Sequence, residues 1–128
     1  MEEHFVDVDG HIMEPSNLWI DYIDPEYKNH ALKIDIDGKG LEYLNVDGDK
    51  SYFGRGGTLG ALGGIGKDAR PYLEPGRISW DEAMVPGGYI SDERVKVMDA
   101  EHIDVTLVYP SLGLLWEQDC KDPKVAAA

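Results

Sequence analysis

Phe5-Val-Asp-Val-Asp-Gly-His-Ile-Met-Glu-Pro15 is the stretch that decides the fold. It opens with aromatic and β-branched residues, which favour a strand. Side chains of a strand alternate between two faces, so Asp7, Asp9 and His11 share one face for as long as the strand lasts. Glu14-Pro15 breaks the strand and leaves Asp9 and His11 at its carboxyl end. α/β barrels place their chemistry at this end of their strands.

The composition excludes several classes of partner. The 128 residues carry a formal net charge of -13, which argues against binding to nucleic acid or to anionic membranes. The start of the chain does not look like a signal peptide, and no apolar run is long enough for a membrane helix. Cys120 is the single cysteine, so no intrachain disulfide forms and a cytoplasmic location is expected. We interpret Cys120 as a packing residue.

The segment after the first strand predicts a short helix and then an antiparallel sheet. Ser16 is placed to cap a helix that ends at Asp24-Pro25. Residues 32–53 alternate apolar and polar side chains and predict a β-meander, with a third strand at 51–53. Asp37-Gly38 and Asp47-Gly48 predict its turns, because the two central residues of such a hairpin turn both take positive φ.

Residues 54–90 form a Gly/Pro-rich segment, with seven glycines between 54 and 66. Gly66-Lys67 resembles part of a phosphate loop, but Asp68 stands where a Ser or Thr should hold magnesium. A dinucleotide-binding glycine pattern is equally incomplete. We therefore interpret residues 54–66 as a mobile loop, with Trp80 and Met84 further on packing back onto the domain.

Residues 91–128 predict a helix followed directly by a strand, as in α/β proteins. Ser91 is the expected N-cap, and Val95 and Met98 are expected to face inward. The strand over 103–109 is almost continuously apolar, which is typical of a parallel strand buried on both faces.

Two blocks together resemble the amidohydrolase-related family of metal-dependent (β/α)8 barrels, the branch that includes aminocarboxymuconate-semialdehyde decarboxylase. One block is Val6 to Pro15, with its Asp-x-His motif. The other is Arg94 to Pro110, where Met98-Asp-Ala-Glu-His-Ile-Asp104 is similar to the family's Met-Asp-x-x-Gly-Ile-Asp signature. His102 replaces the usual Gly at the helix end. The resemblance covers roughly residues 5–28 and 84–128.

The resemblance implies that Asp9 and His11 are the first two metal ligands, with zinc as the expected metal and manganese as the alternative. Glu14 is then either a residue that polarises His11 or a charge at a helix N-terminus, and both alternatives stay open. Asp7 is interpreted as structural, holding the strand against a neighbour. The implied reaction is hydrolysis or non-oxidative decarboxylation of a small organic acid or cyclic substrate.

The implied fold class is α/β: the N-terminal part of a (β/α)8 (TIM) barrel, with a small antiparallel β-meander inserted after the first strand. Residues 1–128 are then a partial domain, since a whole barrel needs about 250 residues. The sequence ends a few residues into a predicted helix, so we expect a fragment without catalysis and with weak or absent zinc. The alternative is a non-catalytic assembly or binding fragment that pairs with another chain or forms a homo-oligomer.

Overall fold

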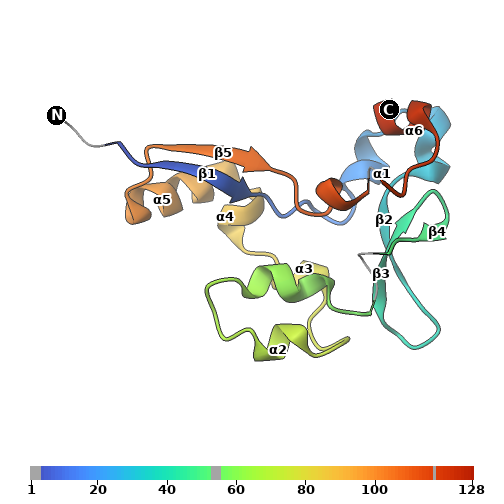
Figure 1. The fold of residues 1–128 in the computed structure, drawn as a ribbon, viewed down its shortest axis with the longest axis horizontal. Coiled ribbons are helices and arrows are strands. Elements are labelled where there is room, and N and C mark those ends of the chain that lie inside the picture. The colour runs from blue at the N-terminus through green and yellow to red at the C-terminus, as the bar shows by residue number, and fades with distance from the viewer. Residues whose placement is uncertain (1–3, 53–55, 117) are drawn as a thin grey trace.

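A computed structural model describes residues 4–52, 56–116 and 118–128. The chain is a mixed α/β structure with a parallel strand pair and a small antiparallel sheet at opposite ends (Figure 1). In chain order the elements are β1 (Val6–His11), α1 (Leu18–Tyr22), η1 (Pro25–His30), β2 (Lys33–Ile36), β3 (Glu42–Val46), β4 (Asp49–Lys50), η2 (Leu59–Gly64), α2 (Arg70–Leu73), α3 (Trp80–Ala83), α4 (Pro86–Tyr89), α5 (Ser91–Glu101), β5 (Val105–Tyr109), η3 (Gly113–Leu115) and α6 (Pro123–Ala127). No helix in the described ranges is long and apolar enough to cross a membrane.

The parallel pair joins β1 to β5, with Val6 opposite Val105 and His11 opposite Tyr109. Helix α5 precedes β5 and lies alongside the two strands (Figure 1). The predicted parallel strand is thus confirmed. Its predicted burial on both faces is wrong, because side chains of β5 from Val105 to Tyr109 are largely exposed. Among the described residues β5 pairs with β1 alone, so its other edge has no partner strand.

The antiparallel sheet has the strand order β2-β3-β4. At the second turn Asp47 (φ 54°) and Gly48 (φ 85°) both take positive φ, as predicted. The first turn also connects two antiparallel strands as predicted, but its expected conformation is wrong: positive φ occurs at Gly40, and the Asp37 carboxylate accepts backbone N–H bonds within the turn. The third strand is Asp49–Lys50 rather than residues 51–53, and Phe53 lies outside the described residues.

The hydrophobic core lies between the antiparallel sheet, α3 and the segments that follow β1 and β5. Its largest fully buried side chain is Trp80, packed in one cluster with Met13, Leu44 and Leu112. The indole Nε1–H of Trp80 donates to the carbonyl of Glu14 at 2.8 Å. Trp80 therefore folds back as expected, and it ties the middle of the chain to the end of β1.

Residues 59–64 form the helix η2 rather than a mobile loop, so that prediction is wrong for this part of the segment. The glycines allow close packing: a Cβ at Gly63 would lie 2.2 Å from the carbonyl oxygen of Ala83 in α3. Sequence alone does not distinguish glycines selected for close contact from glycines selected for mobility. Gly54 lies outside the described residues.

The helix caps differ from those expected. Asn17 occupies the N-cap position of α1, and the Ser16 hydroxyl instead donates to Asp81. Helix α5 begins at Ser91, after Ile90, so Ser91 does not cap it. His102 does end α5 in the left-handed conformation (φ 58°), which fits its place in the motif position usually held by Gly. Val95 is 54% exposed rather than inward, because no described layer covers that side of α5.

Candidate metal centre

Asp9 and His11 lie at the carboxyl end of β1 with their side chains close together. The His11 Nε2 atom is 3.8 Å from the Asp9 Oδ1 atom. Both side chains reach solvent, with 40% of His11 and 88% of Asp9 exposed. The structure therefore brings the two predicted ligands together at an accessible position.

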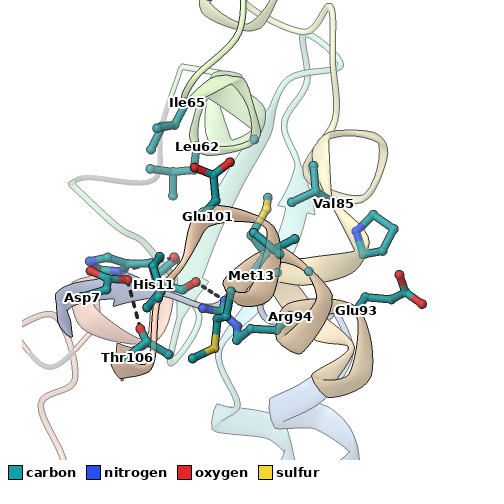
Figure 2. A pocket seen from close by; sticks show the side chains of 18 of the residues that line it. Asp7, His11, Met13, Leu62, Ile65, Val85, Glu93, Arg94, Glu101 and Thr106 are labelled. Atoms are coloured by element: carbon teal, nitrogen blue, oxygen red, sulfur yellow. Dashed lines mark hydrogen bonds between the residues drawn. The ribbon is translucent and has the colours of Figure 1, made fainter. Parts of the chain in front are cut away.

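A distortion of β1 shapes this end of the strand. The register with β5 shifts between Asp7 and Gly10. The Asp7 carboxylate accepts the Asp9 backbone N–H at 3.0 Å and the Thr106 hydroxyl at 3.0 Å (Figure 2). Asp7 thus holds β1 against its neighbour β5, as interpreted from the sequence, and stabilises the irregular backbone that carries Asp9.

Gly10 is required by the same close contact. A Cβ at this position would lie 2.3 Å from the Thr106 hydroxyl oxygen and 2.8 Å from an Asp7 carboxylate oxygen. Atoms at such distances overlap, so one of them would have to move. The Asp-Gly-His sequence therefore serves both the strand pairing and the presentation of its two polar side chains.

The His11 ring is oriented by the loop that follows β5. Its Nδ1 atom lies 3.0 Å from the carbonyl oxygen of Pro110. A carbonyl oxygen only accepts, so this contact assigns the proton of the neutral ring to Nδ1. The lone pair is then on Nε2, the atom nearest Asp9. Metal-ligating histidines commonly donate their other ring N–H to a backbone carbonyl in this way.

Arg94 links the carboxyl end of β1 to helix α5. Its guanidinium donates to the backbone carbonyl of His11. The sequence indicates no function for Arg94, although Arg94 opens the second block of the resemblance. A basic residue one turn into a helix gives no signal of which distant carbonyl it contacts, so only the fold reveals the link.

Glu14 is almost completely buried, with 2% of the residue exposed. Its carboxylate accepts backbone N–H bonds from Ser111 (2.9 Å), Leu112 (3.2 Å) and Gly113 (3.1 Å). These three bonds go to the loop after β5, at the N-terminus of η3, and not to the His11 ring. Whether Glu14 acts on His11 stays a prediction.

A cavity of about 1130 Å³ opens at this site. Its wall combines apolar side chains, among them Leu62 and Ile65, with the charged groups of Arg94 and Glu101 (Figure 2). Asp9 also lines it. The residues that line it come from β1, α5, η2 and α4. The Gly-rich segment therefore contributes a wall of the cavity, which the sequence did not indicate.

The donor set is consistent with part of a metal site. A carboxylate and an imidazole suit zinc, and a hydrogen-bonded Nδ1 leaves Nε2 free to coordinate. Within the described ranges no cluster of three or more His, Cys, Asp or Glu is placed to hold a metal. His30 pairs with Asp47, away from this site. Asp9 and His11 offer two candidate donors, and a metal site would need more.

Cys120 has the surroundings of a packing residue. It lies against the hydrophobic core, and burial raises the pKa of its thiol. A raised pKa lowers the thiolate fraction and hence the reactivity of the sulfur. The interpretation of Cys120 as a packing residue agrees with this placement.

The fold defined by these elements is that of part of an amidohydrolase. A crystal structure of an amidohydrolase from Mycobacterium avium subsp. paratuberculosis K-10 superimposes with a TM-score of 0.66 and 21% sequence identity. The match covers 100% of this chain and 35% of that protein. The expected resemblance to amidohydrolases is thus confirmed at the level of the fold. No family model matches the sequence. A search of curated proteins finds no match either.

Proposed function

We propose that this chain forms the metal-binding N-terminal part of a metal-dependent, amidohydrolase-related (β/α)8 barrel enzyme. The observation that carries the proposal is the pair Asp9 and His11 at the carboxyl end of a parallel strand, with His11 Nδ1 bonded to the Pro110 carbonyl. In a barrel this strand end faces the active site. The likeness to one third of a solved amidohydrolase supports the same placement.

Asp9 Oδ1 and His11 Nε2 would hold the metal, zinc or alternatively manganese, together with donors from further strands. A bound divalent metal polarises a carbonyl or carboxylate and makes water more acidic. The protein's own part is orientation. The Pro110 carbonyl fixes the imidazole, Asp7 fixes the backbone at Asp9, and Arg94 holds the strand end against α5.

The substrate would be a small organic acid or a cyclic compound, and the reaction hydrolysis or non-oxidative decarboxylation. The cavity beside Asp9 is large enough for such a molecule, since ligand pockets commonly measure about 300–1,000 Å³. Its apolar wall suits a ring, and the Arg94 guanidinium adds a positive charge at the same site. Two donors hold a metal weakly, so the chain alone is proposed to lack turnover.

Manganese titration followed by NMR tests this proposal and is sensitive to weak binding. A paramagnetic ion broadens the resonances nearest to it, so we expect selective broadening at Asp9 and His11 in 1H–15N spectra. Asp9→Asn and His11→Gln should each abolish it, and His30→Gln is the matched control that should leave it unchanged. Broadening that ignores the first two substitutions, or that gathers elsewhere, would refute the proposed metal site.

A second candidate function is assembly with another chain or with a second copy. The parallel pair supports it, because Val6, Val8, Val105 and Leu107 are each about half exposed. Apolar strands with a free edge are a template for further pairing. Light scattering over a concentration series tests this candidate. Self-association weakened by Val8→Lys would support it, and a monomer at every concentration would exclude homo-oligomers.

A further inference from the structure

Glu14 is a buried carboxylate whose contacts the proposed metal site leaves unexplained. It is 2% exposed, and none of the ion pairs found in the described ranges includes it. Burying an ionised carboxylate is costly unless hydrogen bonds replace its hydration. Three consecutive N–H groups of residues 111–113 do so here. The buried Glu14 carboxylate therefore fixes the position of residues 111–113.

The residues that Glu14 holds lead directly to the His11 ring. Pro110 immediately precedes the bonded segment, and its carbonyl oxygen lies 3.0 Å from His11 Nδ1. The Ser111 hydroxyl donates to the Ile12 carbonyl, and its oxygen is 3.5 Å from the same ring nitrogen. The carboxylate, the loop and the imidazole therefore form one connected arrangement between the ends of β1 and β5.

We infer that Glu14 is a positioning residue that holds loop 110–113 and so keeps the Pro110 carbonyl on His11 Nδ1. This contact fixes the ring in the Nδ1–H form, with the Nε2 lone pair directed to the site. The inference rests on the proposed function for the use made of that lone pair. It differs from direct polarisation, since Glu14 acts through the backbone of the loop. It also explains why Glu rather than an apolar residue fills a core position.

The test is the tautomer of His11 in the metal-free chain, read from the 15N shifts of its two ring nitrogens at a pH where the ring is neutral. In the wild-type chain the proton is on Nδ1. Glu14→Gln replaces an acceptor by a group whose NH2 faces backbone donors, so the loop moves and the Nε2–H form gains population. The manganese affinity, taken from the concentration dependence of the NMR broadening, should fall about 10- to 100-fold, as for other groups that orient a ligand.

Glu42→Gln is the matched control. Glu42 is a partly buried carboxylate that also accepts a backbone N–H, from Trp80. Loss of this carboxylate should lower stability and leave the His11 tautomer and the manganese affinity unchanged. Ser111→Ala keeps the backbone donor to Glu14, so it also leaves the tautomer unchanged. If Ser111→Ala reproduces the Glu14→Gln effect, the hydroxyl and not the carboxylate orients the ring, and the inference is wrong.

Gly113→Ala covers the case in which Glu14→Gln does not fold. Its Cβ would lie 3.1 Å from Pro110 Cβ and 3.3 Å from a Glu14 carboxylate oxygen, so it presses on the loop while the carboxylate remains. A smaller shift toward Nε2–H is expected. A proton on Nε2 in the wild type overturns the inference, as does an unchanged tautomer in both Glu14→Gln and Gly113→Ala. Absent manganese-induced broadening at Asp9 and His11 in the wild type would instead overturn the proposed function and leave the tautomer result standing.

Discussion

Replacing Gly10 by alanine tests how tightly β1 and β5 meet beside the site. The added Cβ would lie 2.3 Å from the Thr106 hydroxyl, 2.8 Å from an Asp7 carboxylate oxygen and 3.0 Å from the Leu107 carbonyl oxygen. The hydroxyl can rotate away, but the backbone carbonyl cannot move without the strand. We therefore expect a loss of about 2–3 kcal/mol in the free energy of unfolding, from overpacking together with the lost hydrogen bond between Thr106 and Asp7.

Urea unfolding followed by far-UV circular dichroism measures this loss, with Gly38→Ala as the control. A Cβ at Gly38 meets nothing within 4 Å, and its φ is not positive, so the control should be neutral or slightly stabilising. Thr106→Ala removes the nearest obstacle. In a double-mutant cycle, Gly10→Ala and Thr106→Ala together should cost about 1 kcal/mol less than the sum of the single losses.

The reasoning would be refuted by a Gly10→Ala variant within about 0.5 kcal/mol of the wild type, the range of ordinary surface substitutions. Equal effects of Gly10→Ala and Gly38→Ala would refute it as well. Strict additivity in the cycle would show that Thr106 is not the group that the new methyl meets.

Three further predictions follow from other contacts. His102→Gly should stabilise the chain by about 1 kcal/mol in thermal unfolding, because His102 occupies a left-handed conformation that costs non-glycine residues about that much; a lower melting temperature would contradict this. Trp80→Phe should lose about 1–3 kcal/mol by urea titration, because the buried Glu14 carbonyl loses its indole donor; an unchanged midpoint would show that the bond contributes little. Backbone hydrogen bonds, with that of Leu41 the strongest, lower the pKa of Asp37 to about 2, so its stabilisation is complete above its unfolded pKa near 4 and is lost as the pH falls to 2. Asp37→Asn should remove that part of the pH dependence of the free energy of unfolding. If the wild type and the variant lose stability identically in acid, Asp37 makes no such contribution.

The sequence predicts the elements whose pattern is local. The strand at Asp9-Gly-His11 and the hairpin turn at Asp47 follow from residue types at fixed spacing, and the helix end at His102 follows from the family resemblance. What it misses is set by contacts between distant residues. η2 looked mobile because its glycines give no sign of the α3 backbone against which they pack.

The candidate site divides in the same way. Asp9 and His11 are visible in the sequence because they alternate along one strand. The carbonyl that orients His11 belongs to Pro110, and the groups that Glu14 binds are backbone amides, which every residue has. Side-chain identity therefore predicts the candidate donors, and only the three-dimensional fold reveals what holds them.

The contact of His11 with Pro110 joins residues 99 positions apart. Such long-range contacts form late in folding, because the entropy of closing the chain is lost before they contribute any stabilisation. The order of events follows: the antiparallel hairpins and α5 can form early, and the two strand ends meet only after the intervening segment is compact. During synthesis, the ribosome adds Asp9 and His11 long before Pro110. Until Pro110 is added, the chain lacks the carbonyl group that orients the His11 ring.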